Sequence, residues 1–200
     1  PAEAAPLTDA GLTPYHAIKA SLHLLVPGST AVVIGAGGLG HLAVQFIKAL
    51  SPATVICVDQ RESALAVVAG LGADHTVVAG PGAADEIRGL TGGRGAEVVL
   101  DICGYDDTLA LAAAVSAPLG RLTIVGVGGG TLPVNFFTFP YECSVQSTYW
   151  GSVIELGELL ALARTGGFRV HAETYSLDRA GEVYTKMVDG TLQGRAVIVP

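Results

Sequence analysis

The segment Thr30–Gly40 constrains the fold of this chain more than any other feature of the sequence. An apolar run, Ala31–Ile34, leads into a glycine-rich turn, and an apolar segment with helical spacing follows the turn. Nineteen residues after Gly40, a further apolar run, Val55–Val58, stops at Asp59. A strand, a G-x-G-x-x-G turn, a helix, a second strand and an acid in this order are typical of a dinucleotide-binding βαβ unit.

Each glycine of this pattern has a separate physical role. Gly35 permits the tight turn, Gly37 lets the backbone approach a pyrophosphate, and Gly40 lets helix and strand pack closely. The helix N-terminus offers free N–H groups and the positive end of a dipole to the phosphates, so the turn residues Gly38 and Leu39 belong to the same predicted site. The alternative is an ordinary strand–turn–helix unit that binds no nucleotide.

Asp59 is the residue that bears on the choice of cofactor. It is expected to accept hydrogen bonds from the adenosine ribose hydroxyls and to repel a 2′-phosphate. Arg61, two residues later, is a residue type that accommodates the 2′-phosphate of NADP. A carboxylate facing that phosphate costs more free energy than a mobile arginine recovers, so the sequence favours NAD over NADP.

The composition favours a compact α/β interior and argues against several other classes of protein. Half of the 200 residues are apolar and only 14% are charged, as in sheets covered on both faces. The 11 basic and 18 acidic residues give a net charge of −7, and the basic residues never cluster, so no nucleic-acid partner is expected. No apolar run is long enough to span a membrane. Three separated cysteines without a C-x-x-C pair favour free thiols and a cytoplasmic location.

From Ser29 onward the sequence alternates between strand and helix patterns. Strands are expected near 30–35, 54–59, 75–79, 96–101, 121–127 and 144–150, with helices near 38–50, 61–71, 83–90 and 106–117. This alternation predicts an α/β fold with a doubly wound, six-stranded parallel sheet and helices on both faces. Thr13 and Pro14 predict an earlier helix, with Thr13 as its N-cap, that runs to about Leu25.

After Gly151 the rhythm of the sequence changes. A helix is expected over 153–164, a strand over 169–175, a helix over 178–189 and a strand over 195–199. Neither these residues nor the first two dozen form a self-contained second domain. The chain also opens at Pro1 without an initiator Met, which is expected of a fragment or a trimmed chain.

Six segments, in collinear order, resemble the C-terminal part of the zinc-dependent medium-chain alcohol dehydrogenases. They are Ala5–Tyr15, Gly35–Gly40, Leu71–Asp74, Val125–Val127, Tyr149–Gly151 and Gly194–Val197. The resemblance implies a Rossmann NAD-binding domain over residues 25–150. It also implies that residues 1–24 are the remnant of a GroES-like catalytic domain with its connecting helix, and that residues 151–200 return to that domain. Nearly all of the catalytic domain is then expected outside these 200 residues.

The resemblance extends to individual residues. It implies that Val125 and Val127 line the nicotinamide ring, that Arg195 reaches the pyrophosphate, and that Asp9 is the last ligand of a catalytic zinc. The other zinc ligands, a Cys and a His, are expected upstream together with the proton relay. Without the resemblance, Asp9 is a solvated loop carboxylate and Arg195 a surface cation before an edge strand.

The resemblance implies hydride transfer between a primary or secondary alcohol, or the corresponding ketone, and NAD. Zinc would act as a Lewis acid on the alcohol oxygen, and this chain alone is expected to be inactive because ligands are missing. A homodimer or homotetramer joined through residues 133–150 is expected. Two alternatives remain, a non-catalytic NAD-binding module, natural or truncated, and a Rossmann-like methyltransferase.

The sequence holds two further groups of residue types that are common in active sites, a Tyr–Lys pair and five histidines. Tyr15 and Lys19 form a Y-x-x-x-K pair like the acid/base pair of short-chain dehydrogenases, but they precede the first strand and receive no catalytic role. The five histidines are too scattered to form a metal site. His41 opens the helix beside the phosphate turn and is the one histidine that could touch the cofactor.

Overall fold

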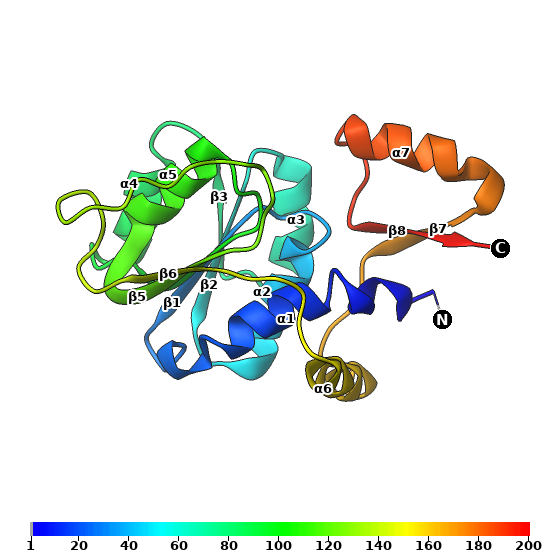
Figure 1. Cartoon of the computed structure of the whole chain (residues 1–200), viewed down its shortest axis with the longest axis horizontal. Coiled ribbons are helices and arrows are strands. Elements are labelled where there is room, and N and C mark those ends of the chain that lie inside the picture. Colours follow the sequence, from blue (N-terminus) through cyan, green and yellow to red (C-terminus); the bar gives the residue numbers. More distant parts are fainter. Residues whose placement is uncertain (1) are drawn as a thin grey trace.

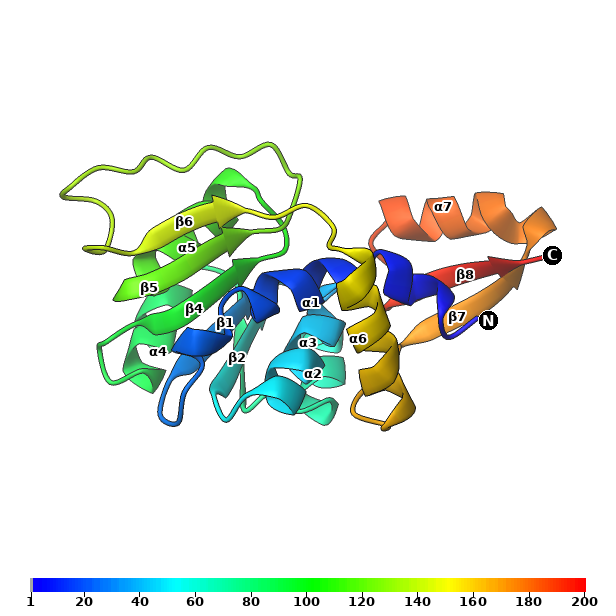
Figure 2. The ribbon, with the colours of Figure 1, turned by 60° about the horizontal axis from the view of Figure 1, so that its bottom comes forward.

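The computed structural model describes residues 2–200, so that only Pro1 of the predicted 1–24 segment lies outside it. Its main body is a six-stranded parallel sheet in the order β3-β2-β1-β4-β5-β6 (Figure 2). The strands are β1 (Thr30–Ile34), β2 (Thr54–Asp59), β3 (His75–Val78), β4 (Ala96–Asp101), β5 (Ser116–Ile124) and β6 (Ser144–Ser147). β2 and β3 follow on one side of β1, and the chain then crosses to the other side for β4, β5 and β6, which confirms the predicted doubly wound fold.

Helices cover both faces of this sheet (Figure 1). One face packs against α1 (Leu12–Lys19), α2 (Gly40–Leu50) and α3 (Glu62–Gly70), and the other against α4 (Ala83–Leu90) and α5 (Asp106–Val115). All five residues of β1 are buried, because successive side chains of this central strand point into opposite layers. Val33 joins the first apolar cluster and Val32 joins the second.

The C-terminal residues form a smaller unit beside the main sheet (Figure 1). It consists of α6 (Val153–Arg164), β7 (Ala172–Ser176), the 3-10 turn η3 (Leu177–Arg179), α7 (Ala180–Val188) and β8 (Arg195–Val199). β7 and β8 pair in parallel as a two-stranded sheet. The N-terminal residues lie against this unit, through η1 (Ala5–Thr8) and α1.

Tyr15 and Lys19 take part in this packing. The Tyr15 hydroxyl donates a hydrogen bond to Glu158 at 3.0 Å, and Lys19 Nζ lies 2.6 Å from the same carboxylate, so both side chains join α1 to α6. Burial and the neighbouring Glu158 raise the pKa of Tyr15 to about 12.

The predicted helix from Thr13 to about Leu25 is wrong at both ends. α1 begins at Leu12 and ends at Lys19, and a separate 3-10 turn, η2 (Leu22–Leu24), follows it. Thr13 is buried and caps nothing, because its own N–H donates to the Asp9 carbonyl at 3.1 Å. The chain turns through η1 directly before α1, so Thr13 lies inside the first turn of the helix and not at its N-cap.

The limits of several other elements also differ from expectation; the strand expected over 169–175 is β7 at Ala172–Ser176, and α5 ends at Val115 rather than 117 because β5 follows it directly. β5 begins at Ser116, five residues earlier than expected, and includes Leu119 with a positive φ of 62°. β6 ends at Ser147 rather than 150. The helix expected over 178–189 is divided into η3 and α7. By contrast, β2, β4, α4, α6 and β8 have the limits predicted from the sequence.

Candidate functional site

The predicted cofactor residues meet in a crevice at the carboxyl ends of β1, β2 and β4. Gly35 follows β1 and its N–H donates to the Val58 carbonyl at 2.7 Å, while the N–H of Ile102 donates to the Ile34 carbonyl at 2.9 Å. The turn after β1 therefore lies between the ends of both neighbouring strands. In open α/β sheets ligands bind at this point, where the strand order reverses.

Three of the four glycines of the turn lie where a side chain has little or no room. Gly35 has a φ of +101°, in the left-handed region that favours glycine, and a Cβ there would lie 2.8 Å from the Cys103 sulfur. A Cβ on Gly40 would overlap the Gly35 carbonyl oxygen. A Cβ on Gly38 would lie 2.6 Å from Cδ of Arg195. Gly37 is open on the crevice side, its nearest neighbour being Nη2 of Arg61 at 3.8 Å. The turn thus has the bare, close-packed backbone that a diphosphate cradle requires.

Asp59 ends β2 with its carboxylate directed at this turn. Oδ2 accepts a hydrogen bond from the N–H of Ala36 at 2.8 Å, and Oδ1 accepts from the N–H of Arg61 at 2.9 Å and from Nε of Arg61 at 3.1 Å. Burial raises the pKa of Asp59, but the hydrogen bonds from Arg61 and Ala36 outweigh burial and hold the pKa below its usual value of 3.8. The carboxylate is therefore ionised at neutral pH.

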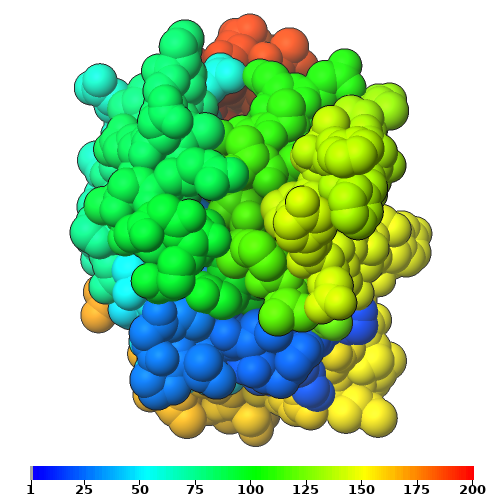
Figure 3. Space-filling model, turned by 90° about the vertical axis from the view of Figure 1, so that its left-hand side faces the viewer, coloured from blue at the N-terminus to red at the C-terminus, as the bar shows by residue number. Residues whose placement is uncertain are grey.

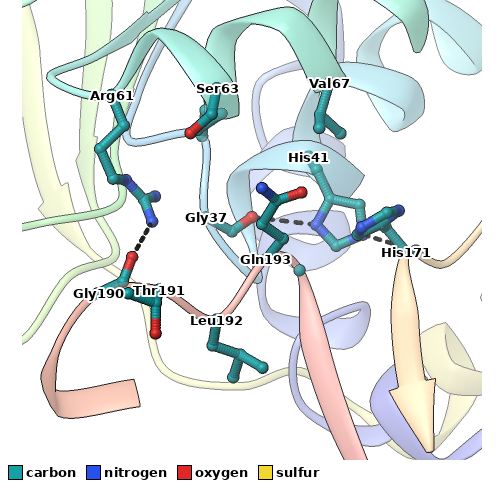
Figure 4. Close-up of a pocket in the computed structure, with 13 residues that line it drawn as sticks. Gly37, His41, Arg61, Ser63, Val67, His171, Gly190, Thr191, Leu192 and Gln193 are labelled. Carbon is teal, nitrogen blue, oxygen red and sulfur yellow. Dashed lines mark hydrogen bonds between the residues drawn. The ribbon is translucent and has the colours of Figure 1, made fainter. Parts of the chain in front are cut away.

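The Arg61 side chain covers this carboxylate from the solvent side. It is 40% exposed, whereas the Asp59 side chain is 10% exposed. Its Nη1 also donates to the carbonyl of Gly190 at 3.1 Å, which ties the crevice to the loop between α7 and β8 (Figure 4). A ribose hydroxyl that approaches Asp59 must share the carboxylate with Arg61 or displace its guanidinium.

Two hollows flank Asp59 and the glycine turn. One, of about 390 Å³, lies between the ends of β1 and β2 and the N-terminal half of α5. Apolar atoms dominate its lining, which includes Val58, Ala79, Tyr105 and Leu111. The other, of about 290 Å³, lies between the glycine turn, α3 and the loop before β8 (Figure 4). Arg61 lines both hollows, and between them they border the acid and the turn.

The predicted site residues Val125, Val127 and Leu39 lie outside the lining of both hollows. Val125, directly after β5, is 8% exposed and its N–H donates to the Asp101 carbonyl at 2.8 Å. Val127 is 99% exposed and projects into solvent. Leu39 is the N-cap residue of α2. The roles of these residues toward a cofactor stay predictions.

Arg195 and Asp9, predicted for two different ligands, are paired with each other. Nη2 of Arg195 lies 3.0 Å from Oδ2 of Asp9, and the indole Nε1–H of Trp150 donates to Oδ1 of Asp9 at 3.1 Å. The Arg195 side chain also lies across Gly38 of the glycine turn. The pair joins the N-terminal residues, the chain after β6 and the start of β8.

The described residues do not by themselves fit a zinc site. Within residues 2–200 no three His, Cys, Asp or Glu side chains lie close enough to hold a metal ion, whereas zinc takes three or four protein ligands. Burial raises the pKa of Cys57 and of Cys103 to about 12, which keeps both as neutral thiols. Asp9 can serve zinc only together with ligands from outside these residues.

His41 supports the glycine turn from behind. It is 1% exposed; Nδ1 lies 3.0 Å from the Gly37 carbonyl, and Nε2 accepts from the N–H of His171 at 3.1 Å (Figure 4). These contacts require the tautomer with hydrogen on Nδ1. Burial lowers the pKa of His41 below 6.5, so the ring is neutral at neutral pH. Both of its nitrogens are thus already bonded within the protein.

Asp101 is a site residue that the sequence reasoning missed. It is fully buried at the end of β4, where Oδ1 accepts from the N–H groups of Cys103 at 2.9 Å and Gly104 at 3.0 Å. Its Oδ2 accepts from the Thr108 hydroxyl at 2.8 Å. Asp101 therefore shapes the loop that faces the glycine turn. The sequence did offer a signal for Asp101, because it ends a mainly apolar strand in the same way as Asp59 does.

Among the helices of residues 2–200, none is long and apolar enough to cross a bilayer. The loop between β5 and β6, in contrast, presents aromatic side chains to solvent. Phe136 is 71% exposed and Phe137 90% exposed, and both belong to a cluster with Tyr141.

Comparison with known proteins gives the family. Residues 38–165 match the family model described as zinc-binding dehydrogenase. The NAD-dependent alcohol dehydrogenase of Sulfurisphaera tokodaii is 37% identical over 206 residues, which cover 99% of this chain and 58% of the relative. The D-arabinose 1-dehydrogenase (NADP(+)) of Saccharolobus solfataricus is 30% identical and covers 100% of this chain.

Solved structures agree with these matches. The crystal structure of the alcohol dehydrogenase of Aeropyrum pernix superposes with a TM-score of 0.93 at 39% identity, over 99% of this chain and 58% of that one. The chain thus spans a little over half the length of the relatives it matches. With a matched family model over most of its length and the same Rossmann architecture, the chain belongs to the zinc-binding dehydrogenase family.

Proposed function

We propose that this chain binds NAD(H) and supplies the cofactor-binding half of an NAD-dependent alcohol dehydrogenase. The observation that carries the proposal is the ionised Asp59 carboxylate directed at a glycine turn between two hollows. In this arrangement the diphosphate rests on the turn of Gly35–Gly40, and Asp59 accepts hydrogen bonds from the adenosine ribose hydroxyls. The adenine enters the larger, more apolar hollow.

The remaining cofactor residues follow from the same placement. Val125 and Val127 flank the nicotinamide, and Arg195 contributes a cation to the diphosphate. Residues 25–150 act as the NAD-binding domain, while residues 2–24 and 151–200 pack together and belong with a catalytic domain. That packing, through contacts such as Lys19 to Glu158, supports the division.

The choice of NAD over NADP rests on charge. A 2′-phosphate placed at Asp59 would face an ionised carboxylate with little solvent to screen it. The name of the Sulfurisphaera tokodaii relative points to NAD, and that of the Saccharolobus solfataricus arabinose dehydrogenase to NADP. Arg61 is the residue through which this chain could serve NADP if Asp59 were absent.

For the intact enzyme we propose hydride transfer between NAD and a primary or secondary alcohol or the matching ketone. This chain's part is to fix the nicotinamide in place. Asp9 is proposed as one zinc ligand, with the others supplied by residues outside the described ones. A homodimer or homotetramer through residues 133–150 is part of the same proposal.

A second candidate function is a non-catalytic NAD-binding module. The observation that favours it is that no three potential metal ligands cluster within residues 2–200. A sequence upstream of Pro1 with a Cys and a G-H-E motif would decide for the enzyme. A gene that starts at this point would decide for the module.

Titration of NADH into the purified chain tests the shared part of both candidates. Trp150 is the only tryptophan, so quenching of its emission and enhancement of nicotinamide fluorescence report on one site. We expect saturable binding that NAD reverses by competition. No response at millimolar NADH contradicts the proposal, and displacement of NADH by S-adenosylmethionine favours a methyltransferase instead.

A further inference from the structure

The Arg195 side chain lies between two possible anionic partners. Its backbone N–H is fixed by the His171 carbonyl at 2.9 Å, at the start of β8. From there the side chain crosses the glycine turn, with Nη1 3.3 Å and Cδ 2.6 Å from the position of a Cβ on Gly38. Together with Gly37 and Gly38, Arg195 lines a hollow of about 410 Å³ that opens onto the turn.

One partner, Asp9, is already in contact. Oδ2 of Asp9 is 3.0 Å from Nη2 of Arg195, and within residues 2–200 this is the one hydrogen bond that the guanidinium makes. The arginine side chain is 34% exposed and the aspartate side chain 48% exposed. An ion pair with this exposure is weak because water screens it. The remaining N–H donors of the guanidinium are free to bind another anion.

The other partner is the diphosphate that the glycine turn is proposed to hold. A diphosphate carries more negative charge than one carboxylate and presents oxygens that suit the forked N–H donors of arginine. Arg195 contacts Asp9 and also lies across Gly38, so its side chain is next to both positions. Asp9 and the diphosphate therefore compete for the same cation.

We propose that Asp9 is an internal competitor for Arg195, and that dinucleotide binding transfers the arginine from the Asp9 carboxylate to the diphosphate. The inference rests on the proposed NAD(H) site and adds a function for Asp9 that needs no metal. Removing the charge of Asp9 should then strengthen cofactor binding. If Asp9 instead held Arg195 in its binding position, the same change would weaken it.

The test is calorimetric titration of NADH into four forms of the full chain: wild type, Asp9→Asn, Arg195→Ala and the double variant. We expect Asp9→Asn to bind NADH about two- to fivefold more tightly, the size that a screened ion pair allows. Arg195→Ala should bind about tenfold more weakly. The double variant should bind like Arg195→Ala alone, because without the arginine there is nothing to release.

Glu142→Gln is the matched control for loss of one negative charge. Glu142 is exposed and lies just before β6, at the amino ends of the strands, whereas the crevice lies at their carboxyl ends. We expect its NADH affinity to equal that of the wild type. Equal tightening in Glu142→Gln and Asp9→Asn would assign the effect to net charge and overturn the proposal.

Inorganic pyrophosphate separates failure of this inference from failure of the NAD(H) site. Trp150 shares Asp9 with Arg195, so pyrophosphate should change Trp150 emission in the wild type and not in Arg195→Ala. NADH binding with unchanged or weaker affinity in Asp9→Asn overturns the exchange and leaves the proposed function standing. Absence of NADH binding in the wild type overturns the proposed function and, with it, the exchange on dinucleotide binding.

Discussion

Gly40 opens α2 at a position where the backbone leaves no room for a side chain. A Cβ there would overlap the Gly35 carbonyl oxygen, and backbone on both sides is fixed by the β1 strand and the helix. Gly157, in the middle of α6, is different, because nothing lies within 4 Å of its would-be Cβ. Substitution of Gly40 by alanine therefore introduces a steric clash, whereas substitution of Gly157 changes only the helix propensity.

We predict that Gly40→Ala lowers the free energy of unfolding by about 2 kcal/mol or more, since the turn must move to admit the methyl group. Gly157→Ala should raise it by about 0.5–1 kcal/mol, because alanine is the better helix former. Urea unfolding followed by circular dichroism measures both changes. Equal effects of the two substitutions would mean that the turn is not as tight as described.

At the scale of elements, two side chains of α2 join the main sheet to the C-terminal unit. His41 accepts from the N–H of His171, and Gln45 exchanges hydrogen bonds with the backbone of Arg169 at 2.8 Å and 2.9 Å. His41 can accept this bond only while Nε2 carries no proton. The attachment of the segment before β7 therefore depends on the charge state of one histidine.

Burial lowers the pKa of His41 below the value of 6.5 that it has when unfolded, with Arg195 and His171 nearby acting in the same direction. Below pH 6.5 the unfolded chain takes up a proton that the folded chain excludes. The stabilisation is therefore complete above pH 6.5 and is lost as the pH falls through 6.5 toward the lower folded pKa.

We predict that the free energy of unfolding falls between pH 7.5 and 5.5 in the wild type, and falls less in His41→Leu, which cannot titrate at this position. His23→Gln, at an exposed histidine in η2, should keep the wild-type pH dependence. The measurement is urea unfolding at a series of pH values. An unchanged slope in His41→Leu would assign the pH dependence to other groups.

The elements also show how far the sequence could predict the fold. β1, β2 and β4 and the helices around them follow from local periodicity, since these strands are mainly apolar and each helix has a buried stripe. The early start of β5 at Ser116 depends on pairing with Ala96 of β4, across a register shift. Thr13 does not cap α1, because η1 leads directly into a helix that begins one residue earlier, at Leu12. The start of β5 and the start of α1 both depend on residues outside the segment whose pattern predicts the element.

For the site, the sequence indicated which residues lie together where the signal is local, and did not where it is not. The glycine turn and Asp59 come from one stretch of chain and meet in the crevice. The pairing of Asp9 with Arg195 joins residues 186 positions apart, and the bonds from Arg61 to Gly190 and from His41 to His171 span 129 and 130 positions. No sequence spacing indicates such contacts.

At the scale of the whole molecule, the exposed aromatic loop and the outer strand lie on the same side. β6 ends the sheet, and the 128–143 loop stands along one edge of the face in Figure 3, in yellow-green. An outer strand beside exposed aromatic residues is a ready surface for another chain. This arrangement favours association of two copies through residues 133–150.

We predict that the wild type sediments as a dimer or larger species, and that Phe136→Ser combined with Phe137→Ser shifts it toward the single 200-residue chain. Val153→Ser is the control, because Val153 is 87% exposed on α6, outside this segment. Sedimentation velocity over a range of concentrations measures the change. Dissociation by the control and not by the double variant would place the contact elsewhere.

The ratio of NADPH to NADH dissociation constants, in the wild type and in Asp59→Asn, tests the central claim most directly. With Asp59 ionised beside the turn, the wild type should prefer NADH strongly. In Asp59→Asn, NADH should bind about tenfold more weakly and the ratio should fall at least tenfold, since Arg61 is freed for the 2′-phosphate. An unchanged ratio would contradict the claim that Asp59 faces the ribose of a bound dinucleotide.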